Sequence, residues 1–558
     1  MRDSTGGGGR VTIVGAGPAG LFLARTVRLR SPGTVVDVYD RLGAAGAAGF
    51  GVSLSARTLR AVAEHDPETH QLIAAASVAQ RGITVRLGSR AVTYPGFEVS
   101  AISRRSLLSV LRHQAGAVGA RLHYGHELRP AEADGDVVAV ADGAASAHRD
   151  ALRHEFGTRT RTGSARFIWL GTTADIGDTA VMAFEPTSAG PMAVHMYAYG
   201  GGMSTVVVEM DDDTWRRSGL DRAVQPNGTI DGKALAYLAG VFAVPLKGCS
   251  LISAGSRWRR FTVVENLRWS HGATVLLGDA AHTAHFTVGS GTKLALEDAL
   301  ALGVALSTHD RPADAFAEYE RRRRPAVGRT QRWAAPSMRW WETYGTRLHL
   351  PLEQFGLNFL TRTPAMTYLG LRRRCPQRLE EAETAFRRAA GEQEPVGSGN
   401  AVTTQLRIAG IHSAGRLAVP AARGPVPRTG TMRPGPGGLI LLGEETEAHR
   451  FATLYCGSDL EVLLNRARVL LRHGVRMFLV LADLGRAGWW ERTLHDAELI
   501  RARTGTPVAV AVPAGWEHDL ARDVTADPWP YRIHLALIAG RIDLVVPLPL
   551  SAPQRDRA

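Results

Sequence analysis

The segment 10–30, RVTIVGAGPAGLFLARTVRLR, is the feature that most constrains how this chain can fold. It predicts a short buried strand, a tight turn and a helix with an apolar face. The turn carries Gly15, Gly17 and Gly20 in the spacing GxGxxG, and the next predicted strand, VVDVYD, ends at Asp40. Glycines in this register let a pyrophosphate reach the start of the helix, and the acid accepts ribose hydroxyls. The segment therefore predicts a dinucleotide-binding βαβ unit; the same unit without a nucleotide is the alternative.

The second informative segment is 274–299, TVLLGDAAHTAHFTVGSGTKLALEDA. It predicts a buried strand, a Gly278-Asp279 turn, a loop ending at Gly289 and Gly291, and a long amphipathic helix. Backbone N–H groups and a helix start converge there, which stabilises negative charge without a side-chain cation. Asp279 is placed to accept hydroxyl donors from a sugar or ribityl chain. Standing alone, this segment could equally be an ordinary strand-turn-helix.

Two shorter segments also point to an anionic ligand of the dinucleotide type. The predicted helix in 101–115 begins with Arg104 and Arg105, and a cation at a helix start is unfavourable unless it meets an anion. Arg105 is equally well explained as a solvated side chain. Farther along, the strand ending at residue 140 is followed by Asp142-Gly143, a second glycine turn.

Composition excludes several classes of protein. A content of 45% apolar and 21% charged residues is typical of a globular protein, and a length of 558 residues predicts two or three domains. Its three cysteines lack CxxC spacing, so we expect no disulfide framework, no metal site and a cytoplasmic location. No apolar run approaches a membrane span. The net charge of +13 favours acidic partners, but no nucleic-acid-binding pattern accompanies it, and phosphate-bearing ligands explain it as well.

The three glycine motifs, in this order, resemble those of the FAD-dependent aromatic hydroxylases of the p-hydroxybenzoate hydroxylase type. The resemblance implies FAD as cofactor and NADH or NADPH as co-substrate. It also implies an FAD site, whose expected residues are Gly15, Gly17, Pro18, Ala19, Gly20, Asp40, Arg41, Arg104, Asp142, Gly143, Gly278, Asp279, Gly289, Gly291 and Thr292.

The loop sequence in segment 274–299 points to one branch of this family. HTAHFTVGSGTKLALEDA, with RFIWLGT, STVVVE and RWSHG, is similar to the salicyloyl-CoA 5-hydroxylase and 2-aminobenzoyl-CoA monooxygenase branch, over about residues 10 to 385. This implies that O₂ forms a flavin C4a-hydroperoxide, which an electron-rich ring attacks, the ring being held as a CoA or carrier-protein thioester. The alternatives are a free aromatic or indole substrate, or a flavin-binding accessory protein without oxygenation.

His285 and Phe286 are the candidate catalytic residues, because they lie on the loop between the Asp279 turn and the turn at Gly289 and Gly291. A loop histidine hydrogen-bonded to backbone is an equal alternative for His285. His282 is expected to be structural.

The predicted fold class is α/β. A Rossmann-type, glutathione-reductase-like FAD-binding domain is expected over 10–165 and 262–388, with an antiparallel substrate sheet inserted at 166–261 and a linker at 389–400. Residues 401–558 open with TQLRIAGIHSAGRLAVP, which resembles the start of an old-yellow-enzyme barrel. About 158 residues are too few for a barrel of roughly 250. We therefore expect a degenerate barrel fragment without FMN, which serves packing, dimerisation as a homodimer, or carrier docking.

Overall fold

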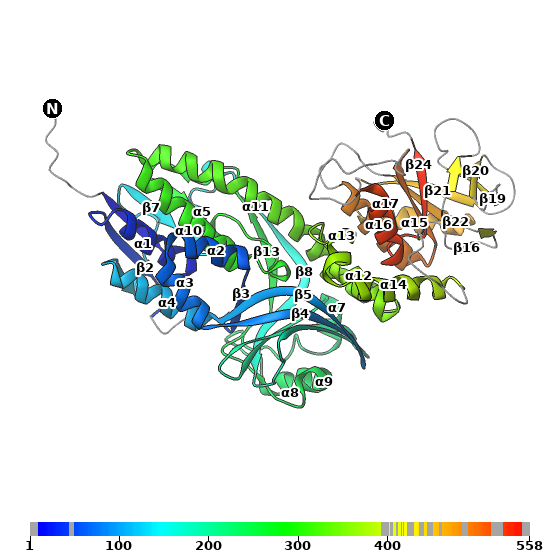
Figure 1. The fold of residues 1–558 in the computed structure, drawn as a ribbon, viewed down its shortest axis with the longest axis horizontal. Coiled ribbons are helices and arrows are strands. Elements are labelled where there is room, and N and C mark those ends of the chain that lie inside the picture. Colours follow the sequence, from blue (N-terminus) through cyan, green and yellow to red (C-terminus); the bar gives the residue numbers. More distant parts are fainter. Residues whose placement is uncertain are drawn as a thin grey trace. The chain divides into compact units, whose positions relative to one another are not determined.

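The computed structural model describes residues 9–43, 49–391, 401, 406–408, 411–413, 416, 418–420, 429–434, 440–443, 450–456, 460–481, 489–514 and 528–548. By contacts the chain divides into two compact units, Met1–Glu342 and Thr343–Ala558 (Figure 1). Among the described residues, no helix is both long and apolar enough to cross a membrane.

A parallel sheet organises the first unit. Its strand order is β14 (Ser270–His271), β15 (Thr274–Leu276), β7 (Val137–Val140), β1 (Arg10–Val14), β2 (Val35–Asp40) and β6 (Arg121–Tyr124). β1 pairs in parallel with β2 and β7, and β15 continues the sheet beyond β7. β7 is buried throughout, as expected for a parallel strand covered on both faces. The predicted βαβ unit is present as β1, α1 (Pro18–Arg30) and β2.

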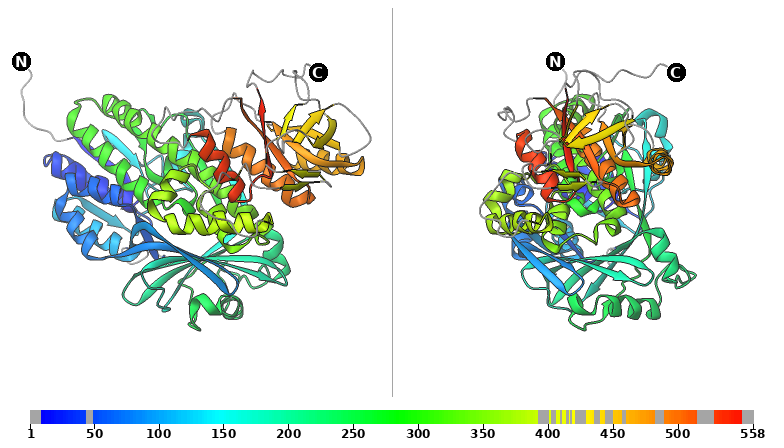
Figure 2. Two further views of the ribbon diagram at one scale, coloured as in Figure 1. Left: turned by 45° about the vertical axis from the view of Figure 1, so that its right-hand side comes forward. Right: turned by 90° about the vertical axis from the view of Figure 1, so that its right-hand side faces the viewer.

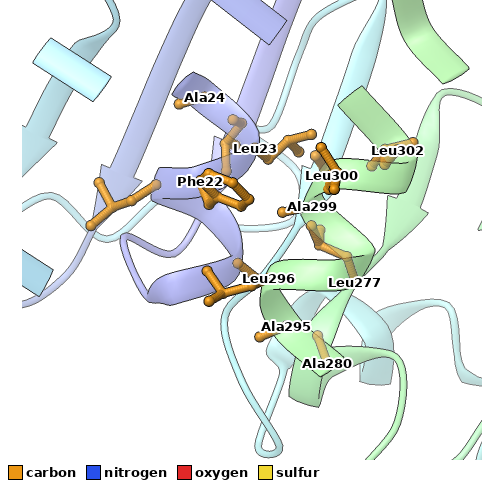
Figure 3. Packing of buried hydrophobic residues seen from close by; sticks show 14 of the residues in the cluster. Phe22, Leu23, Ala24, Leu277, Ala280, Ala295, Leu296, Ala299, Leu300 and Leu302 are labelled. Atoms are coloured by element: carbon orange, nitrogen blue, oxygen red, sulfur yellow. The ribbon is translucent and has the colours of Figure 1, made fainter. Parts of the chain in front are cut away.

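Helices α1 and α10 (Gly291–Thr308) pack together against this sheet. Phe22 and Leu23 of α1 lie beside Leu296 and Ala299 of α10 (Figure 3). Small residues permit the close approach: a Cβ on Gly303 of α10 would lie 2.6 Å from Thr26 Cγ2 of α1. The two predicted ligand-binding helices are thereby fixed side by side. The remaining helices of this part are α2 (Ala56–His65), α3 (Pro67–Ala75), α4 (Arg104–Ala117), α5 (Ala147–Ala151), α6 (Arg153–Phe156) and α11 (Pro312–Thr343).

An antiparallel sheet forms the rest of the first unit. Its order is β12 (Leu251–Ile252), β8 (Arg159–Thr172), β11 (Met203–Met210), β10 (Gly190–Gly200), β9 (Thr179–Thr187), β4 (Ser77–Leu87), β5 (Arg90–Ser103) and β3 (Gly51–Leu54), with β13 (Arg259–Glu265) also pairing with β8. The sheet thus includes strands from residues 51–103 in addition to the strands expected in 166–261. Only β4 and β9 pair in parallel.

Three helices complete this sheet region: α7 (Asp212–Arg217), α8 (Gly232–Val241) and α9 (Ala243–Leu246). Helices α8 and α9 lie on the side of the sheet that faces away from the parallel sheet (Figures 1 and 2). There Leu238 and Phe242 pack with Val206 and Val208 of β11 in one apolar core. Because side chains alternate along a strand, Val207 and Glu209 point to the opposite face.

The second unit combines helices with a mixed sheet. Its helices are α12 (Leu352–Leu360), α13 (Tyr368–Arg374), α14 (Pro376–Ala389), α15 (Leu460–Arg472), α16 (Trp489–Thr504) and α17 (Trp529–Ile538). The sheet order is β18 (Ala418–Pro420), β20 (Ile440–Gly443), β19 (Thr429–Pro434), β21 (Arg450–Tyr455), β22 (Val475–Leu481), β23 (Val508–Pro513) and β24 (Leu544–Leu548), and β16 (Leu406–Ile408) pairs with β17 (Ile411–Ser413).

Strand directions in this sheet are informative. β21 to β24 run parallel in chain order, whereas β19 is antiparallel to both of its neighbours. The N–H of Val545 in β24 donates to the carbonyl of Arg416, two residues before β18, at 3.1 Å, so the two ends of the sheet meet.

A buried polar network ties α12 to the C-terminal helices. Glu498 of α16 accepts hydrogen bonds from Arg347 Nη2 at 2.8 Å and Asn358 Nδ2 at 2.6 Å, and Arg541 Nη1 lies 3.4 Å away. Burial alone would raise the pKa of Glu498, but Arg347 and Arg541 outweigh it and lower the pKa to about 2. Residues 343–391 accordingly group with the second unit by contact. The expected linker at 389–400 lies largely outside the described residues, so that boundary stays a prediction.

Candidate functional site

The first glycine turn contains two kinds of glycine. At two of them a Cβ would clash with the backbone, and at the third a Cβ would face open space. Gly15 has a φ of 104°, and a Cβ there would lie 2.4 Å from Ala141 O. A Cβ on Gly20 would lie 1.9 Å from Gly15 O, so Gly20 sets the packing of α1 on the turn. At Gly17 a Cβ would meet no protein atom within 4 Å. The backbone at Gly17, just before Pro18 and the buried Ala19 open α1, is thus accessible to a ligand.

Three predicted residues from separate segments come together beside this turn. Asp40, at the end of β2, accepts hydrogen bonds from Ala16 N and Leu42 N, both at 2.8 Å. Burial lowers the pKa of Arg104, while the charges of Asp279 and Asp40 act to raise it. Arg104 therefore lies within electrostatic reach of both carboxylates. Arg41 is exposed.

The Gly278-Asp279 turn lies against the start of α1. Gly278 has a φ of 59°, and a Cβ there would lie 3.2 Å from Ala19 Cβ. Asp279 is open to solvent at the turn, yet protein surrounds it closely enough for desolvation to raise its pKa, against the charges of His282 and Arg104. Asp279 is therefore a solvent-accessible carboxylate that neighbouring protein partly desolvates.

The turn at Asp142 lies at the end of β7. Asp142 Oδ2 is 3.2 Å from His148 Nδ1, while its Oδ1 is buried without a hydrogen-bond partner. Gly143 has a φ of 88°, and a Cβ there would meet nothing within 4 Å. Arg149 Nη1 donates to Ala144 O at 2.8 Å and to Ala280 O at 3.4 Å, which joins this turn to the Asp279 turn.

Asp298 of α10 is a residue that the sequence analysis missed. It is fully buried and accepts from Gly278 N at 3.1 Å, His282 Nε2 at 2.7 Å and Arg323 Nε at 2.8 Å. Burial would raise the pKa of Asp298, but the charges of His282 and Arg323 lower it. These contacts hold the Asp279 turn on α10 and give His282 the structural role expected for it.

The loop before α10 supplies the remaining predicted residues. Gly289 has a φ of 61°, Gly291 begins α10 with no protein atom near a Cβ position, and Thr292 is half-buried in the first turn. Ser290 Oγ is buried without a hydrogen-bond partner. Open backbone at Gly17, Gly143 and Gly291, with unpartnered oxygens on Asp142 and Ser290, fits a long ligand carrying hydroxyl, amide and phosphate groups, as FAD does.

His285 and Phe286 lie on the loop in an aromatic surround. His285 is buried, shares a hydrogen bond with Thr287 Oγ1 at 2.7 Å through Nδ1, and has its Nε2 3.9 Å from Glu209 Oε1. Phe286 stacks on His285 at 4.5 Å and lies 4.7 Å from Phe167. His285 therefore bonds a side chain rather than only backbone.

A cavity of about 260 Å³ opens beside this loop. His285, Thr283 and Ala284 form one wall; the others are Arg159, Thr160, Arg161, Val263, Glu265, Gln331, Ala334, Ala335 and Met338. Arg159 and Arg161 are exposed, and neither forms a salt bridge within the described part of the chain. Neighbouring strands β8 and β13 place Arg159 opposite Glu265.

Comparison with known proteins agrees with this geometry. Residues 137–334 match the family model described as FAD binding domain. The chain is 39% identical to a salicyloyl-CoA 5-hydroxylase from Streptomyces sp, over 63% of this chain and 70% of that protein. It is 36% identical to a 3-hydroxy-4-methyl-anthranilyl-[aryl-carrier protein] 5-monooxygenase from Streptosporangium sibiricum, over 63% of this chain and 94% of that protein.

The chain belongs to the FAD-dependent aromatic hydroxylases. The fold agrees: the solved structure of tetrameric 2-methyl-3-hydroxypyridine-5-carboxylic acid oxygenase superposes with a TM-score of 0.50 at 18% identity, over 64% of this chain and 98% of that one. This hydroxylase is an aromatic-ring monooxygenase that uses FAD, with NADH or NADPH as reductant. Sequence analysis also missed Glu209 of β11 and His195 of β10, whose Nε2 lies 3.2 Å from Glu209 Oε2, because strand pairing and not a local motif brings them together.

Proposed function

We propose that this hydroxylase acts on an electron-rich aromatic ring carried as a thioester on the phosphopantetheine arm of CoA or of a carrier protein. The observation that supports it most is the cavity that runs from His285 to Arg159 and Arg161. Two guanidinium groups without ion-pair partners suit a phosphate, whose oxygens accept bidentate hydrogen bonds. The names of two relatives, at 39% and 36% identity, also describe thioester substrates.

The volume of the cavity suits a phosphopantetheine arm with its ring better than a complete CoA molecule. About 260 Å³ is below the roughly 300–1,000 Å³ typical of drug-sized ligand sites. A narrow, linear chain ending in a ring fits such a volume, with the bulk of CoA or a carrier protein remaining outside. The inner wall is formed by Ala284, Ala334 and Met338, which are apolar and suit the ring.

We propose roles for the predicted site residues on the same basis. The backbone of Gly15, Gly17, Pro18, Ala19 and Gly20, with Arg104, would hold the pyrophosphate, and Asp40, with Arg41 nearby, the adenosine ribose. Asp279 would hold the ribityl chain, and Asp142, Gly143, Gly278, Gly289, Gly291 and Thr292 would line the flavin. When bound, FAD supplies the activation of O₂. The protein's own task is to orient the ring, exclude water and balance charge.

The test compares thioesters with and without the phosphoadenosine diphosphate part of CoA, which carries all of its phosphates. Flavin reduction by NADH and by NADPH is followed by stopped flow with salicyloyl-CoA, 2-aminobenzoyl-CoA, the matching pantetheine thioesters and the free acids. We expect the thioesters to accelerate reduction and to be hydroxylated. In the double variant R159A/R161A, the KM for the CoA ester should rise about 10- to 100-fold, as expected for lost charge-assisted hydrogen bonds. The KM for the pantetheine ester should change little.

The control is R57A/R60A, which removes two exposed arginines of α2 outside the cavity. It should leave both KM values unchanged. If a free phenol or indole accelerates flavin reduction and no thioester does, the substrate is a free aromatic compound and the thioester proposal is wrong. The cavity is large enough for such a ring alone.

We further propose that residues 401–558 are a shortened (β/α) barrel that packs or docks rather than catalyses. The parallel run β21 to β24 with its helices, and the meeting of the sheet ends at Val545 and Arg416, support this. The antiparallel β19 departs from an all-parallel barrel. The three free cysteines are in keeping with a cytoplasmic location. A homodimer belongs to the same proposal and is tested by light scattering of the full chain.

A further inference from the structure

Glu209, His195 and His285 form a buried polar cluster next to the cavity. Their exposed fractions are 1%, 5% and 3%. His195 Nε2 lies 3.2 Å from Glu209 Oε2, and His285 Nε2 lies 3.9 Å from Glu209 Oε1. A carboxylate this deeply buried is costly unless positive charge or donors face it. His195 fills that role at one oxygen, and a proton taken up by His285 would meet the other.

The cluster is assembled by strand alternation and pairing. β10 and β11 are antiparallel neighbours, with Ala193 opposite Glu209 and His195 opposite Val207. His195 and Glu209 therefore share the face of the sheet that looks away from the apolar core formed by Val206 and Val208. His285 approaches this face from the loop that follows the Asp279 turn.

Aromatic rings enclose the cluster. Trp341 stacks on His195 with ring centroids 4.0 Å apart, and Phe261 meets His285 edge-on at 4.9 Å. Phe286 lies 5.8 Å from His195 and stacks on His285. Rings on several sides exclude water and lower the local dielectric, which strengthens the effect of the carboxylate on a proton at either imidazole.

The two nitrogens of His285 have different surroundings. Nδ1 bonds Thr287 Oγ1 at 2.7 Å, and Thr287 Oγ1 in turn bonds Ser337 Oγ of α11 at 2.9 Å. This chain of hydroxyls fixes the ring orientation. Nε2 faces Glu209 across 3.9 Å, which exceeds a hydrogen bond, and His285 lines the cavity. Nε2 is thus the nitrogen better placed to take a proton, with a carboxylate near enough to stabilise the resulting charge.

We propose that His285 removes the proton from a hydroxyl donor of the aromatic ring, that Glu209 is a positioning residue that raises the basicity of His285, and that His195 positions Glu209. The donor's O–H bond breaks, an N–H bond forms at His285 Nε2, and the electron pair stays on the oxygen attached to the ring, which makes the ring a better nucleophile. Glu209 stabilises the imidazolium, and His195 holds the other carboxylate oxygen. This inference rests on the proposed function, because it requires an aromatic substrate with such a donor.

Charged groups on other elements also face His285. The ones that share its cavity are Arg159 and Arg161 of β8 and Glu265 of β13. Arg159 and Arg161 are exposed at the cavity and screened by solvent, whereas Glu209 is buried. Glu209 therefore has the largest effect on the proton affinity of His285.

The experiment replaces Glu209 by its neutral isostere and follows two signals. The first is the pH dependence of single-turnover hydroxylation of salicyloyl-CoA. The second is the absorbance of salicyloyl-CoA bound to oxidised enzyme without reductant, which distinguishes phenol from phenolate. E209Q is expected to lower the rate about 10- to 100-fold, as for a weakened general base, with FAD content and flavin reduction unchanged.

The direction of the pH shift is part of the expectation. The rate should rise with pH as His285 becomes neutral. Loss of the carboxylate disfavours the imidazolium, so in E209Q this rise should move about one pH unit or more to lower pH. The bound phenol should ionise at lower pH than the free phenol in wild type, and this difference should shrink in E209Q. A purely structural role for Glu209 would move neither signal.

A matched control and a second variant complete the design. E185Q makes the same substitution on β9 of the same sheet, at a partly buried glutamate whose pKa is raised by burial, and should behave as wild type. If E209Q fails to hold FAD, H195Q provides the same readouts with the carboxylate retained but without the imidazole that holds it, and should lower the rate by a smaller factor and move the pH profile. Profiles of both variants that coincide with wild type would overturn the inference while leaving the proposed function intact. If wild type hydroxylates a free phenol and no thioester, the thioester proposal fails, and the same signals are measured with that phenol.

Discussion

Two regions of this hydroxylase, the glycine turns of the first unit and the Glu498 carboxylate of the second, treat buried polar oxygens in opposite ways. In the first unit, Asp142 Oδ1 and Ser290 Oγ are buried without hydrogen-bond partners. In the second, the carboxylate of Glu498 is met by Arg347, Asn358 and Arg541. An unsatisfied buried group costs about 1–3 kcal/mol, so a ligand that meets these two oxygens would stabilise the first region, whereas the carboxylate of Glu498 already has its partners within the chain. Unsatisfied groups beside open glycines mark a binding site; satisfied ones mark packing.

The largest expected effect comes from filling the open backbone of the first unit. Because a Cβ on Gly17 would meet no protein atom, G17V should fold but block the approach of a dinucleotide. We expect purified G17V to carry almost no flavin, as measured by the ratio of 450 nm to 280 nm absorbance. Gly33 likewise has open space around it, so G33V is the matched control and should retain full flavin. Full flavin in G17V would contradict the contrast between the units.

The next effect concerns the self-contained network of the second unit. E498A leaves Arg347 and Arg541 as buried cations without their carboxylate, and we expect it to destabilise this unit by about 3–5 kcal/mol. Amide hydrogen exchange in α12 and α16 measures the loss region by region. Protection in α1 and α10 should stay as in wild type. A uniform loss across both units would show that they do not unfold separately.

Acid should act on the same network with a slightly smaller effect. The pKa of Glu498 in the folded protein is about 2, below the roughly 4.3 of an unfolded glutamate. Its stabilisation is therefore present above about pH 4.3 and is lost as the pH falls towards 2, by about 3 kcal/mol in all. Exchange in α16 should accelerate over this window in wild type and much less in E498Q. An equal acid response in both proteins would assign acid sensitivity to other carboxylates.

Local sequence patterns predicted the parts of the site that local chain geometry determines. Gly20 is required by a contact within the βαβ turn and Gly15 by its φ of 104°, so spacing alone finds them. Spacing along the chain does not identify Glu209 and His195. Their contact depends on the register of β10 against β11, and the approach of His285 to Glu209 depends on a loop some 75 residues later. The same holds for Glu498, whose partners Arg347 and Asn358 lie about 140–150 residues earlier. The antiparallel β19 likewise follows from no periodicity, since strand direction is set by sheet neighbours.

The pairing of β15 with β7 has a consequence for synthesis of the chain. Val275 pairs with Ala139, so the parallel sheet stays incomplete while the antiparallel sheet between them is translated. Such non-local pairing slows folding, and nascent chains fold as segments emerge from the ribosome. The first glycine turn exists early, but α10, its neighbour across the apolar contact shown in Figure 3, is made some 270 residues later. Flavin capture is therefore a late event in biogenesis, and a nascent chain halted before residue 291 should bind no FAD.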